Sequence, residues 1–592
     1  MANRYWVGGS AVWDATAGTK WSTTSGGAGG AAVPTTADDV FFNAASGAST
    51  VTTVSNTQNF KSLDCTGFTG SLQFGGTATC AGGITLVSGM TLVATGSTVL
   101  MNATTDNGGS PWIIELGGKS LNAMTLSGVG GSWKLGSNST FVAAFNLGAG
   151  TFSTDNKNLS VGTFASIGTT ARTLTLGSST VTVVSNSAGW STTSTGLTVT
   201  SNTATVSFTG TAAQFAGSNV NFNGTSFTMN GAGAAATSGS WTAANFTRVS
   251  TAVKTDTLSV SGNPVVTGTL TLTGDSATNR LLVFSDVIGT TRTISAAVVS
   301  LTNVDFADIT GAGAATWSGT SIGNALGNSN ITFTTPVTRY CVSTGGAVDL
   351  DSTTMWATTS GGTPGASVPL CHDDVVFDAN SGATNNRLNQ TRFCRNLTVT
   401  SGFVRSLTAT NSTATTIYGD VVFGANMTGL GNSSAGVWQL SGRGAQTIQM
   451  NGASFSNTSS SGLVSIITPS GSYSMQDAFS GSSGTLNVQA GTLNTNNYSI
   501  TIPSFLANQG AKARTVNLGT SIVTVSTWAA SGVTLNASSS TIVIANASTA
   551  SRTFGGGGLT YGTLNYTVAN SPGTLAITGS NTFGTLNIGP GR

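Results

Sequence analysis

Apolar residues alternate with threonine and serine along most of this chain. Residues 173–177 (Thr-Leu-Thr-Leu-Gly) and 269–274 (Thr-Leu-Thr-Leu-Thr-Gly) have an apolar side chain at every second position and end on a small residue. A period of two predicts short, half-buried strands. Because such phrases follow one another without a helical pattern between them, the sequence predicts an all-β protein with almost no helix.

Strands this short bury their apolar face when the chain winds into coils that stack on one another. We therefore expect an elongated parallel β-solenoid, or β-helix. A propeller or serial β-sandwiches are alternatives, but the phrases lack a fixed blade period. Stacked Thr, Ser and Asn ladders also suit the outer faces of flat parallel sheets.

The chain contains a duplicated module. Residues 4–48 match residues 339–383 without a gap, at an offset of 335, and roughly half of the positions are identical, as in an internal repeat. A looser echo links residues 150–190 to residues 491–528. The duplication is therefore expected to extend from the modules into the strand-rich tracts.

These repeats predict four segments. A Trp-rich first module at 1–80 begins the solenoid, and a β-solenoid tract follows at 81–335; a second copy of the module at 336–410 begins a second tract at 411–592. Arg592 stands where the phrase of a further coil would start, so we expect an open C-terminal end that docks against another chain, or an end left by processing.

Charge is scarce and evenly balanced. The 592 residues include 21 Lys+Arg and 19 Asp+Glu, about 7 % charged, while 39 % are hydrophobic, enough for a true core. A net charge of +2 provides no field that would concentrate the protein on nucleic acid or an anionic membrane. We expect neither nucleic-acid binding nor membrane insertion.

The cysteines and the start of the chain indicate where the protein is made. Five cysteines without CxxC spacing predict reduced thiols rather than disulfides or a zinc site. The first residues have no apolar signal-peptide core, and no segment approaches 18 continuous apolar residues. A soluble protein outside the standard secretory route is expected.

Paired aspartates are the first candidate site. Asp38 and Asp39 recur as Asp373 and Asp374, each pair after a Val-Pro turn and before a strand, as weak candidates for a calcium site or an acid/base pair. Adjacent strand residues point to opposite faces, so we favour carboxylates that accept turn N–H groups.

The only histidine, His372, lies beside the second aspartate pair. The first module has Ala37 at the matching position, so the two copies do not share a His-dependent triad. With a single histidine, a single glutamate and no recognisable nucleophile motif, the sequence predicts no enzymatic activity and no cofactor.

Aromatic residues form the second candidate site. They are Tyr5, Trp6, Trp13 and Trp21 in the first module, with Tyr340 and Trp356 in the second, where Cys341 replaces one tryptophan. These rings are candidates for stacking on glycan. The alternative, which we favour, is that they close the end of the solenoid.

Four arginines recur in an Arg-Thr phrase, Arg172, Arg292, Arg514 and Arg552. They are wide apart, so an array for acidic glycans is less consistent with the pattern than a structural corner. In such a corner the guanidinium bonds carbonyl groups of a neighbouring coil.

The module phrases resemble those of a family of bacteriophage structural proteins. Arg-Tyr-Trp-Val-Gly-Gly at 4–9, Thr-Thr-Ser-Gly-Gly at 23–27 and Asp-Asp-Val at 38–40 carry the resemblance, as does the junction at 299–309. It implies a virion fibre or surface protein assembled in the host cytoplasm. Analogy with phage fibres implies a homo-oligomer, with a trimer as the first expectation.

The sequence and the resemblance together predict a non-enzymatic virion structural protein: a tail fibre, adhesin or surface decoration. Its expected partners are copies of itself, other virion proteins and a host-surface glycan. One alternative is a tailspike-like polysaccharide depolymerase with aspartates in a groove. Another is a subunit of a bacterial surface filament or adhesin, outside the cell.

Overall fold

The structure is a computed structural model and confirms the predicted fold class. Strands account for 51 % of the chain and helix for 1 %, and stacked parallel coils form a β-solenoid of about 23 turns. Within the described residues the only helices are the short 3-10 turns η1 (Ala44–Ser46) and η2 (Thr353–Met355). None of the described helices has the length and apolar character needed to cross a membrane.

The structure describes residues 2–13, 19–52, 57–187, 189–201, 203–342, 348–382, 386–410, 414–432, 436–455, 463–510, 512–546, 551–568 and 574–589. The expected docking end at Arg592 lies outside these residues.

The chain forms two compact units. Unit 1 comprises Met1–Gly274, Arg292–Leu301 and Thr310–Ser318, and unit 2 comprises Asp275–Thr291, Thr302–Ile309 and Gly319–Arg592. Three segments from the predicted first tract, 275–291, 302–309 and 319–335, therefore pack with the second module and its tract.

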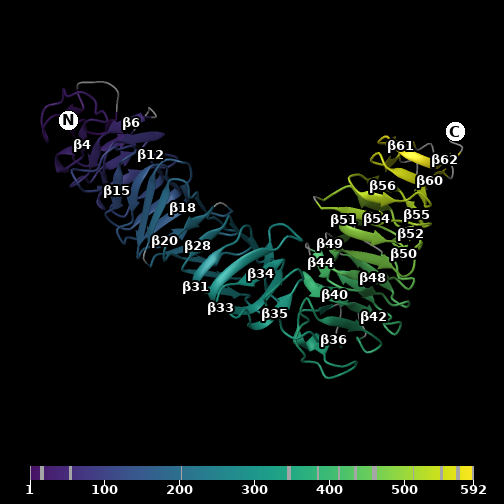
Figure 1. Cartoon of the computed structure of the whole chain (residues 1–592). Helices are drawn as coiled ribbons and strands as arrows, with labels where there is room; N and C mark the ends of the chain where they lie inside the picture. Colours follow the sequence, from purple (N-terminus) through teal and green to yellow (C-terminus); the bar gives the residue numbers. More distant parts are fainter. Residues whose placement is uncertain are drawn as a thin grey trace. The chain divides into compact units, whose positions relative to one another are not determined.

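In unit 1, successive coils contribute strands to a ten-stranded sheet. Its order is β22 (Leu197–Ser201), β19 (Arg172–Gly177), β17 (Gly150–Ser153), β15 (Ser132–Leu135), β13 (Trp112–Glu115), β10 (Ile84–Thr85), β7 (Ser62–Asp64), β4 (Asp39–Phe41), β1 (Asn3–Trp6) and β3 (Trp21–Ser22). Its strands pair in parallel from coil to coil, except that the edge strand β3 is antiparallel to β1. In Figure 1 the strands of unit 1 follow one another in chain order.

A second face of unit 1 has a continuous column of outward hydroxyl groups. The strands are β14 (Ser120–Leu126), β16 (Ser139–Leu147), β18 (Leu159–Ser166), β20 (Thr180–Val183), β23 (Thr205–Phe208), β26 (Ser226–Met229), β29 (Asn245–Val249) and β31 (Val265–Thr273). The paired residues are Ser120, Thr140, Ser160, Thr182, Ser207, Thr228, Thr247 and Thr271. Their neighbours in each strand, such as Val206 and Phe227, are buried. The period of two thus produces the expected ladder.

Unit 2 has the same construction. Its 17-stranded sheet runs through β36 (Thr338–Cys341), β38 (Trp356–Ala357), β39 (Asp374–Phe377), β41 (Arg392–Cys394), β42 (Leu397–Val399), β44 (Ala414–Ile417), β45 (Val421–Val422), β47 (Val437–Leu440), β48 (Ala445–Gln449), β49 (Leu463–Met475), β51 (Thr485–Asn494), β53 (Ser504–Ala507), β54 (Arg514–Asn517), β56 (Thr527–Ala530), β57 (Thr534–Asn536), β59 (Arg552–Gly555) and β61 (Leu575–Thr578).

Two smaller sheets complete the coils of unit 2. One contains β37 (Val348–Asp349), β40 (Asn386–Leu388), β43 (Ser406–Ala409) and β46 (Gly429–Asn432); the other contains β50 (Phe479–Ser480), β52 (Ile500–Thr501), β55 (Ile522–Val525), β58 (Thr541–Asn546), β60 (Thr560–Val568) and β62 (Thr582–Ile588).

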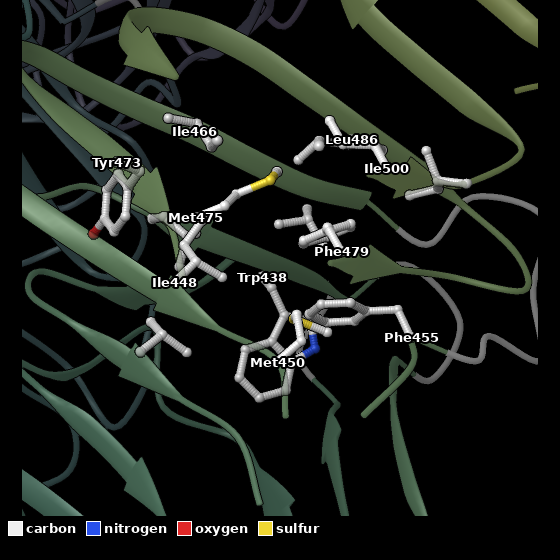
Figure 2. Close-up of a cluster of buried hydrophobic side chains, with 14 of the residues drawn as sticks. Trp438, Ile448, Met450, Phe455, Ile466, Tyr473, Met475, Phe479, Leu486 and Ile500 are labelled. Atoms are coloured by element: carbon white, nitrogen blue, oxygen red, sulfur yellow. The ribbon is translucent and has the colours of Figure 1, made fainter. Parts of the chain in front are cut away.

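The core of unit 2 is a continuous apolar interior between these sheets. Figure 2 shows side chains of successive coils pointing into it, among them Trp438, Phe455 and Phe479. Tyr473 brings its hydroxyl inside, where it donates to Gly419 O at 3.0 Å and accepts from Gly442 N at 3.2 Å. The one polar atom of this side chain is therefore satisfied within the core.

The weaker sequence similarity between residues 150–190 and residues 491–528 is also visible in equivalent hydrogen bonds. Thr154 Oγ1 donates to Leu176 O at 2.8 Å and accepts from Ser179 Oγ at 2.8 Å. Thr495 Oγ1 repeats this with Leu518 O at 2.9 Å and Ser521 Oγ at 2.7 Å. The same buried hydroxyl pair therefore closes a corner in both units.

Candidate functional site: the duplicated modules

Both modules use the same three strands in the same register. In the first, Trp6 of β1 faces Trp21 of the antiparallel β3, and Asn3 of β1 faces Asp39 of the parallel β4. In the second, every partner is 335 residues later: Cys341 faces Trp356, and Thr338 faces Asp374. The sequence duplication is thus a duplication of structure.

The first aspartate of each pair belongs to the turn before the strand. Asp38 Oδ2 accepts from Thr35 N at 3.0 Å and Thr35 Oγ1 at 2.9 Å. Asp373, almost fully buried, accepts from Leu370 N at 2.8 Å and Val337 N at 2.9 Å. Burial alone raises the pKa of Asp38, but the Thr35 hydrogen bonds and the Arg4 charge outweigh it and lower that pKa.

The second aspartate of each pair points to the outer face and meets a cation of the next coil. Asp39 accepts from Ser62 Oγ at 2.5 Å and lies 3.4 Å from Lys61 Nζ. Asp374 holds Arg395 in a two-point contact, at 2.9 Å to Nε and 2.7 Å to Nη2. The two carboxylates of a pair therefore do not converge on one atom. Among the described residues, no three His, Cys, Asp or Glu side chains form a group that could hold a metal ion.

The aromatic residues separate into two groups. Trp6, Trp13 and Trp21 are buried, with ring centroids 5.0 and 5.1 Å apart in edge-to-face contacts that centre on Trp21. Trp356 is also buried, and its Nε1 donates to Leu350 O at 3.1 Å. These indoles fill the core of each module and present no ring face to a ligand.

The tyrosines lie on the outer side of the same strands. Tyr5 is half-buried and stacks on Phe41, with ring centroids 4.7 Å apart at 17°. Tyr340 is also half-buried, and its strand neighbour is Val376 instead of a phenylalanine. An outer aromatic pair is therefore a property of the first module.

The same turn is exposed in one module and covered in the other. Thr35, Thr36 and Ala37 are exposed, whereas Leu370, Cys371 and His372 are buried. The cover in unit 2 comes from β35 (Thr320–Asn324) and the residues after it: Asn324 N donates to His372 Nδ1 at 2.8 Å, and His372 Nε2 donates to Thr334 O at 2.7 Å. His372 is therefore a structural residue of the second module, and the shorter side chain of Ala37 suits an exposed turn.

Under this cover lies a buried ionic cluster that the sequence analysis missed. Asp305 Oδ1 accepts from Arg280 Nη2 at 2.6 Å, and its Oδ2 accepts from Arg392 Nε at 2.7 Å. Burial raises the pKa of Asp305, but the two guanidinium groups and their hydrogen bonds prevail and lower it to about 2. The cluster therefore fastens residues 275–291 and 302–309 to β41 of the second module.

Gly323 makes room for this cluster. A Cβ on Gly323 would lie 2.0 Å from Asp305 Oδ1 and 2.9 Å from Cys371 Sγ, so only glycine fits. Arg443 adds a second link, since its Nη2 donates to Asp308 Oδ2 at 2.7 Å. The only sequence signal was the junction phrase at 299–309, which gave Asp305 no role.

Two of the four recurring arginines, Arg172 and Arg514, form the structural corners that their spacing suggested. Arg172 donates to Ser166 Oγ at 2.9 Å, Thr170 O at 2.8 Å and Thr195 O at 3.0 Å. Arg514 donates to Gly510 O at 2.6 Å and Gly532 O at 3.0 Å. Both guanidinium groups are buried and bond successive coils, so they are not presented to an acidic ligand.

Comparison with known proteins finds no match: no protein-family model, curated protein or solved structure is significantly similar to this chain.

Proposed function

We propose that this protein is a non-enzymatic structural protein of a bacteriophage virion, acting as a tail fibre, adhesin or surface decoration. The observation that carries the proposal is the fold, because stacked β-coils form an extended scaffold that is compatible with a fibre or adhesin. The resemblance of the module phrases to phage structural proteins is the reason for assigning the scaffold to a phage virion.

The placement of the acidic groups favours a scaffold over a depolymerase. Glycoside hydrolysis needs two carboxyl groups about 5 to 9.5 Å apart and open to the substrate. Asp38 and Asp373 are committed to turns, and Asp39 and Asp374 to cations of the next coil. Glu115, the single glutamate, accepts from Gly117 N at 2.8 Å and from Ser137 Oγ.

The proposed partners are copies of the same chain, other virion proteins and a glycan on the host surface. A homotrimer is the first expectation, by analogy with phage fibres. The surface carries few charges, so specific attachment would depend on hydroxyl, amide and apolar contacts.

Immunogold electron microscopy of purified particles, with antibodies against the full chain, tests the proposal. Label on tails, fibres or the capsid surface supports it, whereas label on cellular filaments in the absence of phage overturns it. Release of reducing ends from host polysaccharide by the purified chain, abolished by an Asp→Asn change, would instead establish a depolymerase.

A further inference from the structure

A shallow groove crosses four successive coils on one face of unit 1. It has a volume of about 360 Å³ and is formed by β18, β21 (Trp190–Thr192), β24 (Gln214–Ala216) and β27 (Ala234–Ser238). The strands pair in parallel, and one column of outward residues, Ala165, Ser191, Ala216 and Ser238, is in register along the groove. Small side chains in four consecutive coils therefore create the hollow.

The floor of the groove is held by packed rings. Phe164 and Trp190 lie beneath the outward column, stacked with centroids 4.0 Å apart at 18°. They are buried, as is Phe215 in the next coil. The groove is therefore a rigid, preformed surface, which lowers the entropic cost of binding.

The chemistry of the lining selects the ligand. Thr163, Ser191, Gln214 and Ser238 supply hydroxyl and amide groups, and Ile167, 58 % exposed, supplies an apolar wall. The lining contains no charged side chain, so nothing there would compensate a charged ligand. Hydroxyl and amide partners beside exposed C–H surface are the groups that recognise an uncharged sugar.

The repeat of the groove favours a polymer. Neighbouring strands lie about 4.8 Å apart, so the hydroxyls of Ser191 and Ser238 are two coils, or about 10 Å, apart, with Ala216 between them. The spacing per coil is comparable with the advance of one sugar residue in an extended glycan. A peptide is a poorer match, because strand addition needs a free sheet edge and these strands are paired on both sides.

The duplicated coils of unit 2 have a hollow at the corresponding place. Phe505 of β53 stacks on Trp528 of β56 as Phe164 stacks on Trp190, with centroids 4.6 Å apart at 8°. A groove of about 210 Å³ lies beside them and includes Asn508 and Ala529, at the positions of Ile167 and Ser191. Its lining is also uncharged. The hollow has thus been kept in both copies while its side chains differ.

We propose that the groove of unit 1 is a binding site for an uncharged oligosaccharide that lies across the coils. The inference rests on the proposed function, since it assigns the place where an adhesin would contact host glycan. It also assigns attachment to the solenoid tract and not to the module tryptophans.

The test is a glycan array probed with the labelled full chain. The array carries uncharged oligosaccharides of two to six sugar residues, together with sialylated and uronic-acid-containing oligosaccharides. Uncharged glycans should bind, and Ser191→Trp should weaken that binding at least about tenfold by filling the groove. Ser238→Trp, two coils away, is a second blocking variant if the first does not fold. Thr198→Trp, exposed on β22 of the same coil, is the matched control and should bind like the wild type.

Three results would overturn the inference: no binding to uncharged glycans, binding to charged glycans alone, or folded groove variants that bind like the control. Its failure is distinguishable from that of the proposed function. If the protein is on the particle but the array is silent, only the groove assignment fails; if uncharged glycans bind but no particle carries the protein, only the virion assignment fails.

Discussion

Asp305 and Arg392 are 87 residues apart in sequence and form an ion pair of 2.7 Å in the interior of unit 2. Asp305 is 1 % exposed, and a second arginine, Arg280, holds its other oxygen. An acid this buried is stabilised only while both guanidinium groups face it. The cover over the second module therefore depends on the charge of one carboxylate.

The first prediction concerns the pH dependence of unit 2. The pKa of Asp305 is lowered to about 2 from an ordinary value near 4, so its contribution is complete above about pH 4 and is lost as the pH falls towards 2. This contribution is about 2 kcal/mol. Urea titrations of the wild type and Asp305→Asn should show a constant difference in unfolding free energy from pH 5 upward. That difference should shrink by about 2 kcal/mol on acidification, and a difference unchanged down to pH 2 would contradict the assignment.

The second prediction uses the two modules as each other's control. His372→Ala removes two hydrogen bonds under the cover, from Asn324 N and to Thr334 O, and should lower the free energy of unfolding by about 2 kcal/mol. Ala37→His places the same side chain on the exposed turn and should change it by less than about 0.5 kcal/mol. Equal effects of the two substitutions would show that the turns are not covered differently.

The third prediction is that calcium does not stabilise the protein. Asp38 and Asp373 accept turn N–H groups, and Asp39 and Asp374 face cations, so these four carboxylates do not converge on one site. Calcium at about 5 mM, above the dissociation constants of weak extracellular sites, should leave the melting temperature unchanged. A rise that is lost in Asp373→Asn but retained in Asp349→Asn, an exposed acid on β37, would identify a calcium site.

The fourth prediction concerns the thiols. All five cysteines are free and buried; burial raises the pKa of Cys80 to about 12, and it also raises the pKa of Cys65, Cys371 and Cys394 well above the ordinary thiol value. Thiolate is the reactive form, so a disulfide reagent at pH 8 should label none of them in the folded protein and all five after unfolding. Rapid labelling of one thiol in the native state would show local opening of its coil.

The strands and the duplication could be predicted because both are patterns that the sequence shows directly. Alternation fixes which side chains face outward, as in the column from Ser120 to Thr271, and the offset of 335 aligns Trp21 with Trp356 in equivalent strands. The arginine corners were predicted for a related reason, since Arg172 and Arg514 follow the same small-residue loop. These features need no knowledge of distant contacts.

The cover of the second module could not be predicted, because it depends on which surfaces meet. Alternation in Val304-Asp305-Phe306 places Asp305 on the outer face, yet all three residues are buried because Arg392 covers that face. His372 likewise lies in a turn whose first copy is exposed. The nearly uncharged composition also concealed the role of the few charged residues, several of which form this cluster.

The last prediction concerns the arginine corners and separates their structural role from recognition of an acidic ligand. Arg172 bonds Thr170 O and Thr195 O, which belong to successive coils, and burial lowers its pKa. A guanidinium spans such carbonyls because its five N–H donors form a planar fork, whereas a lysine ammonium is a single point. Arg172→Lys should therefore keep the charge, leave buried carbonyls unpaired and cost about 1–3 kcal/mol of unfolding free energy. Arg387→Lys is the matched control, since Arg387 forms an exposed ion pair with Asp349 and should change the same quantity by less than about 1 kcal/mol. Urea titration of both variants measures the difference in unfolding free energy. If Arg172→Lys is as stable as Arg387→Lys but loses affinity for an acidic polysaccharide such as heparin, the corner is a binding site and not a structural joint.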